Sequence, residues 1–246
     1  MSKMHNVRLS PEMIARVMTR RGGRMHAIER LDPAKTALIV IDMQNVWVKE
    51  GMPAYTPHCE AIVPNINCLA AAMRNAGGTV WWVRAIYGDD APRSWSAYME
   101  FLDPKFISDM LAALTEGHEG AALWHALDIR PGDQHVIKRR FSALIQGSSD
   151  LDARLRAAGI DTVIVTGTAT NVCCESTARD AFMLNYRTLV VADANATTSD
   201  EAHNASLNAL FNRFADVFTT DEVIAMLQAG SRDAVAGAPL QQRARA

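Results

Sequence analysis

Three side chains of different chemistry lie at or just beyond the ends of short segments rich in Val and Ile: Asp42, Lys138 and Cys173. A carboxylate can accept a proton and return it, an ammonium can stabilise a neighbouring negative charge, and a thiolate is a soft nucleophile. A charged group at the end of a buried strand is costly unless it is paired or takes part in chemistry. Together the three residues indicate covalent catalysis.

Each of these residues also has an ordinary structural interpretation. Asp42 could cap a helix or a turn, and Lys138 could be a solvated lysine in a basic cluster with Arg139 and Arg140. Cys173 could be a small buried hydrophobic residue. The residues by themselves therefore indicate an α/β enzyme with a candidate thiol nucleophile, and they leave both interpretations open.

The elements that must position these residues follow from the alternation of short apolar runs with longer helical patterns. Strands are expected at residues 36–41, 79–83, 134–138, 162–166, 188–192 and 215–218, and helices at 60–76, 150–158, 173–185 and 200–212. This order predicts parallel pairing with right-handed crossovers. The fold class is therefore α/β, a Rossmann-like three-layer α/β/α sandwich around a mainly parallel six-stranded sheet.

The carboxyl ends of the strands are where chemistry gathers in such sheets. Cys173 falls at the predicted start of a helix, where unpaired backbone N–H groups are expected to lower the pKa of a thiol. The same N–H groups could hold an oxyanion. The stretch 88–132 is irregular and too long for a plain connection, so it is expected to form a lid, an edge helix or an oligomer contact.

Three parts of the chain are expected. Residues 1–30 form an N-terminal helical extension with Ser10 as N-cap and a Gly-Gly pair as its stop signal. Residues 31–230 form the main domain, and residues 231–246 form a C-terminal tail.

Composition excludes several classes of protein. The chain has 246 residues and a net charge of −2, so no basic field is available to attract nucleic acid. No apolar run approaches the roughly 18–20 residues needed to span a membrane. The N-terminus lacks the apolar core of a secretory signal, which predicts a cytoplasmic protein.

The four cysteines are expected to be reduced thiols. Two of them are adjacent, and no C-x-x-C pair or matching histidine pair suggests structural zinc. No G-x-G-x-x-G or P-loop motif is present, so no nucleotide cofactor is expected.

Three segments of the sequence resemble motifs of the isochorismatase-like cysteine hydrolases. They are residues 37–45 (ALIVIDMQN), 138–142 (KRRFS) and 165–181 (VTGTATNVCCESTARDA). The resemblance extends to residues 193–197 and His203, and it covers roughly residues 34–225. The third segment is most similar to members of the ureidoacrylate and carbamoyl amidohydrolase type.

The resemblance implies an Asp-Lys-Cys triad. Asp42 would take the thiol proton, Lys138 would stabilise the charged pair, and Cys173 would be the nucleophile. Cys174 stands where relatives usually carry Val, which implies that it packs in the core.

The resemblance also implies a non-proline cis peptide near Ala169-Thr170. In the family this bond turns backbone N–H groups toward the oxyanion, and the matching groups here are those of Thr170 and Cys173. No metal is expected, because the Asp-x-His pair of the nicotinamidases is absent and His58 stands alone.

The implied activity is hydrolysis of a linear amide, ureido or carbamoyl C–N bond of a small molecule, through an acyl-enzyme and without a cofactor. The alternatives are an isochorismatase-type ether hydrolase and a catalytically idle binding or assembly protein. A homo-oligomer, either dimer or tetramer, is a family-level expectation.

Candidate substrate-binding residues follow the strand ends. Arg139 or Arg140 could pair with a substrate carboxylate or could simply be solvated. The full set of candidates is Gln44, Asn45, Trp47, Tyr87, Arg139, Phe141, Ser142 and Asn171.

Overall fold

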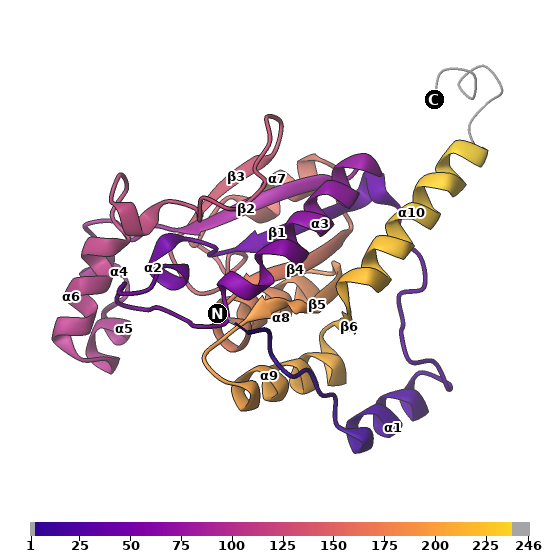
Figure 1. Cartoon of the computed structure of the whole chain (residues 1–246), viewed down its shortest axis with the longest axis horizontal. Helices are drawn as coiled ribbons and strands as arrows, with labels where there is room; N and C mark the ends of the chain where they lie inside the picture. Colours follow the sequence, from indigo (N-terminus) through magenta and orange to yellow (C-terminus); the bar gives the residue numbers. More distant parts are fainter. Residues whose placement is uncertain (1–2, 238–246) are drawn as a thin grey trace.

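A six-stranded parallel sheet forms the centre of the molecule, with helices on both faces (Figure 1). The computed structural model describes residues 3–237. The strands are β1 (Thr36–Ile41), β2 (Thr79–Ala85), β3 (Gln134–Lys138), β4 (Thr162–Thr168), β5 (Arg187–Ala196) and β6 (Asp216–Phe218). Their order is β3-β2-β1-β4-β5-β6, and every neighbouring pair is parallel. The predicted fold class is confirmed.

The strand order reverses between β1 and β4. The chain builds outward from β1 through β2 to β3 and then returns to the other side of β1 with β4. The crevice at the carboxyl ends of these two central strands is the place where open α/β sheets bind ligands. Asp42 follows one of these strands, and the segment that contains Cys173 follows the other.

Burial on both faces explains why the central strands read as continuous apolar runs. In β1, Ala37, Ile39 and Ile41 belong to the core on one side of the sheet. Leu38 and Val40 belong to the core on the other side. This alternation is the two-residue period of a strand, and it places a helical layer over each face.

The helices divide between the two faces of the sheet. Residues of α7, α8 and α9 contribute to one core, and residues of α3 and α10 contribute to the other. The helices are α1 (Pro11–Arg20), α2 (Asn45–Val48), α3 (Val63–Asn75), α4 (Ala91–Ser94), α5 (Ser96–Phe101), α6 (Pro104–Ala113), α7 (Leu151–Ala157), α8 (Glu175–Met183), α9 (Asp200–Arg213) and α10 (Thr220–Gly237).

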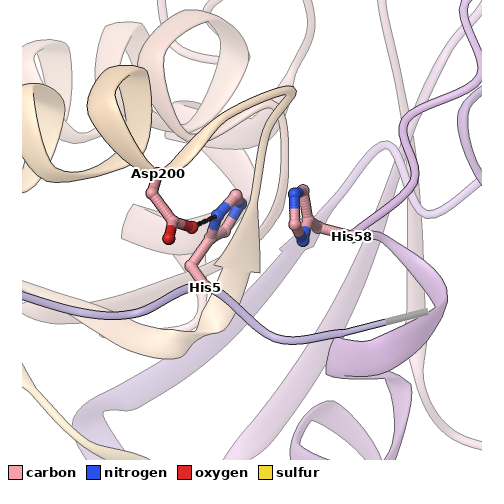
Figure 2. Close-up of side chains that lie close together, drawn as sticks. All are labelled: His5, His58 and Asp200. Carbon is pink, nitrogen blue, oxygen red and sulfur yellow. Dashed lines mark hydrogen bonds and ion pairs between the residues drawn. The ribbon is translucent and has the colours of Figure 1, made fainter. Parts of the chain in front are cut away.

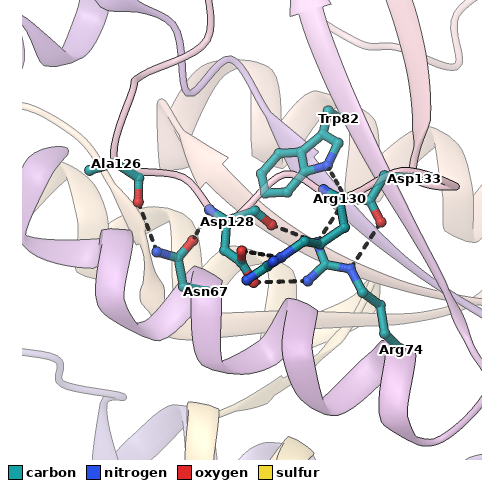
Figure 3. A network of polar contacts seen from close by, with 7 residues as sticks. All are labelled: Asn67, Arg74, Trp82, Ala126, Asp128, Arg130 and Asp133. Carbon is teal, nitrogen blue, oxygen red and sulfur yellow. Dashed lines mark hydrogen bonds and ion pairs between the residues drawn. The ribbon is translucent and has the colours of Figure 1, made fainter.

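The irregular stretch 88–132 forms the short helices α4, α5 and α6, which lie together at one end of the molecule in Figure 1. Its last part is fastened to α3 and β2. Arg74 pairs with Asp133 through two hydrogen bonds of 2.9 and 2.7 Å, and the indole of Trp82 donates to the same carboxylate (Figure 3). Asn67 bonds the adjacent backbone. This network fixes the entry to β3, the strand that carries Lys138.

The N-terminal segment forms α1 with Ser10 as its N-cap, as the sequence predicts. The segment before α1 runs beside α9, and Val17 of α1 is buried in the core. At the other end of the chain, α10 continues through residues 231–237, and the remainder of the predicted tail lies outside the described residues. No helix within residues 3–237 is long and apolar enough to cross a membrane.

Candidate active site

Asp42 sits in an unusual backbone conformation directly after β1. Its φ is +53°, in the left-handed region that residues other than glycine seldom adopt. Its N–H donates to the carbonyl of Val83 at 2.9 Å, and its side chain is completely buried. Next to it, a Cβ on Gly167 would lie only 2.0 Å from the carbonyl oxygen of Ile41. Glycine at this position therefore allows β4 to approach the end of β1.

Lys138 is completely buried, which rules out a solvated strand-end lysine. Its Nζ lies 2.8 Å from Oδ2 of Asp42, 3.4 Å from Sγ of Cys173 and 3.1 Å from the carbonyl oxygen of Arg140. An ammonium has three N–H donors, and these contacts use all of them. Because β2 lies between β3 and β1, the two outer strands are about 10 Å apart. The long side chain of Lys138 and the carboxylate of Asp42 bridge this distance together.

Cys173 lies in a π-helical turn, Thr170–Cys174, that precedes α8. The predicted helix at 173–185 is therefore replaced by a wider turn and a shorter helix. The turn begins at Ala169, whose carbonyl accepts from the N–H groups of Val172 and Cys174. The cis peptide is Thr168–Ala169, one residue earlier than expected.

The neighbouring thiols differ from Cys173. Cys174 is completely buried with its Sγ 3.8 Å from the carbonyl of Thr166, so it packs in the core as expected. Cys59 is buried against Thr168, whereas Cys68 is exposed. Among the four, Cys173 alone contacts Lys138 in the described part of the chain.

Burial and charge set the protonation of the triad. Burial raises the pKa of Asp42, and the ammonium of Lys138 opposes this shift. Burial alone would lower the pKa of Lys138, but the carboxylate of Asp42 and the contact with the sulfur of Cys173 raise it to about 12. Burial and the carboxylate of Asp42 raise the pKa of Cys173. The 2.8 Å contact between Nζ of Lys138 and Oδ2 of Asp42 is a carboxylate–ammonium pair, and the raised pKa of Cys173 leaves a neutral thiol beside it.

This result corrects the expectation that a helix N-terminus lowers the pKa of the Cys173 thiol. The thiol is 6% exposed and faces the carboxylate of Asp42, and both effects outweigh the N–H groups of the turn. A thiolate at Cys173 would therefore have to form by proton transfer to the carboxylate of Asp42.

The side chains of several predicted substrate-binding residues form hydrogen bonds with backbone groups. The amide of Gln44 donates to the carbonyls of Ala85 and Ala121 and accepts from the N–H of Ala85. Asn45 donates to a carbonyl of the segment before β3. The hydroxyl of Ser142 accepts from two backbone N–H groups of the following turn. These three side chains hold loops in place around the site.

Tyr87 and Phe141 belong to an aromatic cluster with Trp95 and Tyr98, two residues that the sequence interpretation missed. Trp95 and Tyr98 stack with ring centroids 4.4 Å apart, and Phe141 packs edge-on against both. Burial raises the pKa of both tyrosines, and the proximity of the titratable thiol of Cys173 adds to the shift. The aromatic cluster therefore lies beside Cys173. The missed signal was the aromatic content of the irregular stretch.

The remaining candidates lie farther out. Arg139 is exposed and packs against Gly88, where an added Cβ would lie 2.7 Å from the guanidinium. Arg140 instead lies 5.1 Å above the ring of Trp95, beside the aromatic cluster. Asn171 is exposed and accepts a hydrogen bond from Thr197, and Trp47 packs half-buried between two parts of the core.

One group of residues within 3–237 has the composition of a metal site. His5, His58 and Asp200 place their ligand atoms within 4.8 Å of one another (Figure 2). His58, which looked isolated in the sequence, therefore has neighbours. However, Nε2 of His5 accepts from the N–H of Thr197 at 3.0 Å, so Nδ1 carries the proton that is donated to Asp200 at 2.7 Å. Both ring nitrogens are in use, and a metal would have to break one of these bonds.

Comparison with known proteins agrees with this geometry. The family model described as "Isochorismatase domain" matches residues 36–222. The chain belongs to the isochorismatase family of cysteine hydrolases. The match includes all three residues of the triad.

Two family relatives and one solved structure illustrate the range. The chain is 34% identical to ureidoacrylate amidohydrolase RutB of Methylobacterium radiotolerans, over 72% of this chain and 73% of that protein. It is 27% identical to an N-carbamoylsarcosine amidase of Arthrobacter sp, over 79% of this chain and 72% of that protein. A cysteine hydrolase structure from Pseudomonas syringae pv. phaseolicola 1448A aligns with a TM-score of 0.74 at 30% identity, covering 82% of this chain and 97% of that one.

Proposed function

We propose that this isochorismatase-family member is a cysteine-dependent amidohydrolase that cleaves a linear C–N bond of a small molecule and releases ammonia. The observation that carries the proposal is the buried triad. Nζ of Lys138 lies 2.8 Å from the carboxylate of Asp42 and 3.4 Å from the sulfur of Cys173. In this arrangement the carboxylate of Asp42 can act as a base, the thiol of Cys173 can act as a nucleophile, and the ammonium of Lys138 can stabilise negative charge on either of them.

Acylation begins with proton transfer from the thiol of Cys173 to the carboxylate of Asp42. The sulfur attacks the carbonyl carbon of an amide, ureido or carbamoyl group, and a C–S bond forms. When the tetrahedral intermediate collapses, the C–N bond breaks and the nitrogen takes the proton from Asp42 to leave as ammonia. A thioester or thiocarbamate remains on Cys173. Lys138 stays protonated throughout and stabilises whichever partner is negative.

Deacylation reverses the roles. Water attacks the acyl carbon while Asp42 accepts its proton, the C–S bond breaks, and the proton returns to the sulfur of Cys173. The product is the free acid, and the thiol is restored. No electron transfer occurs, so the reaction needs no redox cofactor.

The oxyanion of each tetrahedral intermediate would be held by the backbone N–H groups of Thr170 and Cys173. The alternating N–H groups of Val172 and Cys174 are bonded to the carbonyl of Ala169 and are therefore engaged. Loss of one oxyanion donor typically costs about 3–4 kcal/mol of transition-state stabilisation.

The choice of a C–N bond rests on the complete triad and on relatives named as amidohydrolases. RutB is named for ureidoacrylate, and the Arthrobacter relative is named for N-carbamoylsarcosine. A ureido or carbamoyl group is the chemistry that these two names share. It is the substrate class we propose for this chain.

The test is ammonia release from a panel of ureido acids, carbamoyl amines and simple linear amides. Wild type is compared with Cys173→Ala and with Cys174→Val, which changes the adjacent buried thiol. We expect turnover by wild type and Cys174→Val and none by Cys173→Ala. Pyruvate release from isochorismate would indicate the ether hydrolase instead. No turnover of any compound would favour an idle binding protein.

A further inference from the structure

A row of four polar side chains on α9 pairs with the N-terminal segment. Asp200, Asn204, Asn208 and Asn212 follow one another at intervals of four residues, so they lie on one face of the helix. The first three bond the backbone of residues 6–10, and the fourth accepts from Arg20 of α1.

The pairing has the regularity of a strand lying along a helix. The N–H groups of Asn6, Arg8 and Ser10 donate to Asp200, Asn204 and Asn208 at 3.3, 2.6 and 2.8 Å. The amides of the two asparagines donate in return to the carbonyls two residues earlier in the segment.

Helix and segment match in pitch. Four helical residues rise about 6 Å, and two extended residues advance about 6.6 Å. Every second residue of the segment therefore meets the next turn of α9. We call residues 5–10 the strap.

His5 fastens the end of the strap beside the nucleophile turn. Its ring is almost completely buried, bonded to Asp200 and to the N–H of Thr197 (Figure 2). It stacks on the ring of His203 with centroids 4.3 Å apart. Thr197, which follows β5, also donates a hydrogen bond to Asn171 of the nucleophile turn. His5 is therefore connected to that turn through Thr197 as well as through His203.

His203 carries the contact inward to the turn. Its Nδ1 shares a 2.8 Å hydrogen bond with the hydroxyl of Thr170, and both residues are completely buried. Ser206, one turn along α9, donates to the carbonyl of Thr170. The chain of contacts runs from His5 through His203 to Thr170, three residues before the nucleophile.

We propose that the strap holds the nucleophile turn in its working position and that His5 is a positioning residue acting through His203 on Thr170. This inference rests on the proposed function, in which the N–H of Thr170 binds the oxyanion. The strap lies outside residues 36–222, the part matched by the family model. It is a contribution of this chain's own N-terminal segment to the site.

The cluster of His5, His58 and Asp200 serves the strap rather than a metal. The N–H of Thr197 can only donate, so it fixes the tautomer of His5 with the proton on Nδ1. A metal at Nδ1 would need the opposite tautomer, which would turn an N–H against an N–H. The experiment below therefore includes added Zn²⁺ as a separate arm.

The test compares His5→Ala with His135→Ala, a matched change at an exposed histidine of β3. Hydrogen exchange is followed in peptides covering residues 168–175, and kcat and KM are measured for the best substrate of the panel. In His5→Ala, but not in His135→Ala, we expect faster hydrogen exchange of these peptides. We also expect a 10- to 100-fold lower kcat in His5→Ala, with KM changed by no more than about twofold, because small misplacements of reacting groups lower the rate by this amount. Added Zn²⁺ should not slow the exchange of wild type.

Unchanged exchange at 168–175 in a folded His5→Ala protein would overturn the proposal, and so would a Zn²⁺-dependent slowing in wild type that His5→Ala abolishes. If His5→Ala does not fold, His5→Gln replaces it. Its amide oxygen can still accept from Thr197, so exchange should lie between wild type and the loosened state, and wild-type exchange would contradict the role of the ring. A wild type without any turnover would defeat the proposed function, while exchange would still decide the role of the strap.

The double variant His5→Ala/Thr170→Val tests the route. Thr170→Val removes the hydroxyl that His203 bonds. If His5 acts through this bond, the two changes should lower kcat by less than the product of their separate effects. Fully multiplicative effects would contradict the route through His203 and Thr170.

Discussion

At the scale of single residues, the site depends on how Lys138 uses its three protons. Its three N–H groups point to the carboxylate of Asp42, the sulfur of Cys173 and the carbonyl oxygen of Arg140. The last contact belongs to the backbone, so it anchors the ammonium while the other two partners exchange a proton. A buried ion pair is stabilising only when both partners are present, because a lone buried charge is strongly unfavourable.

Lys138→Met should therefore abolish turnover and destabilise the fold. Breaking a buried ion pair typically costs about 3–5 kcal/mol, because the carboxylate of Asp42 is left without its partner. Urea unfolding and ammonia release measure the two effects. The double variant Asp42→Asn/Lys138→Met should recover part of the stability and none of the activity. Unchanged stability in Lys138→Met would show that the two groups are not paired.

The pH dependence of kcat/KM should show the raised pKa of Asp42. The carboxylate must be ionised to accept the thiol proton, so the rate should fall as pH drops through a pKa above the ordinary 3.8. Lys138, with its pKa near 12, keeps its charge across the accessible range. Because the thiol reacts from its neutral form, the rate should not climb with an apparent pKa near 9.0. Such a climb would show that a preformed thiolate attacks.

From the residues alone, Asp42, Lys138 and Cys173 are expected near one another because they end or follow apolar strands of a parallel sheet. The resemblance to the isochorismatase-like cysteine hydrolases implies that the three form a triad. The rule for strand ends does not predict the positions of Trp95 and Tyr98. Their position depends on how an aperiodic stretch folds over the sheet. The rule does not predict the contacts of His5 either, because its partners lie about 195 positions away along the chain.

At the scale of elements, β4 and β5 are distorted where they approach the site. Their register shifts between Val165 and Gly167, which interrupts the regular hydrogen-bonding ladder there. The amide of Asn195 donates to this carbonyl at 3.0 Å and to that of Val191 at 2.7 Å. A buried side chain thus supplies hydrogen bonds to backbone carbonyls at the irregularity, where the ladder is interrupted.

This distortion explains the difference between the predicted and observed strand lengths. The sequence predicts β4 to end at 166 and β5 at 192, because polar and small residues follow. In the structure β4 continues to Thr168 and β5 to Ala196, with the polar side chains bonded inside. Hydrophobic pattern alone cannot reveal a strand whose polar side chains find buried partners.

Gly167→Ala tests the close approach of β4 to β1. A Cβ there would lie 2.0 Å from the carbonyl oxygen of Ile41, next to Asp42. Gly77→Ala is the matched control, since Gly77 also has a positive φ but no atom within 4 Å of an added Cβ.

Both variants carry the backbone strain of a left-handed residue, about 1–2 kcal/mol. Gly167→Ala should lose clearly more stability than that, and it should also lose activity because Asp42 is displaced. Equal losses of unfolding free energy in the two variants would contradict the close approach.

At the scale of the whole molecule, two buried histidines link the stability of the fold to pH. Burial lowers the pKa of His203 to about 3, and it also lowers that of His5, which faces Asp200, His58 and His203. Both are neutral in the folded protein and titrate at their ordinary value of 6.5 once unfolded.

The free energy of unfolding should therefore be highest above pH 6.5 and fall as the pH decreases below it. The reason is that the two histidines bind protons in the unfolded chain but remain neutral in the folded chain. Urea unfolding between pH 7.5 and 4.5 measures this slope. A variant with His203→Gln should show a shallower slope, whereas the exposed control His135→Ala should not. A stability that rises on acidification would contradict the buried neutral state of these rings.

The most direct measurement of the central claim is the trapping of the acyl-enzyme. A ureido or carbamoyl substrate that is turned over is mixed with the protein, and the reaction is quenched in acid during turnover. Intact mass and peptide mapping then locate any adduct. We predict an adduct of the acyl fragment on Cys173 in wild type, its persistence in Cys174→Val, and its absence in Cys173→Ala. Turnover with full ammonia release by Cys173→Ala, or an adduct on any other residue, would contradict the account.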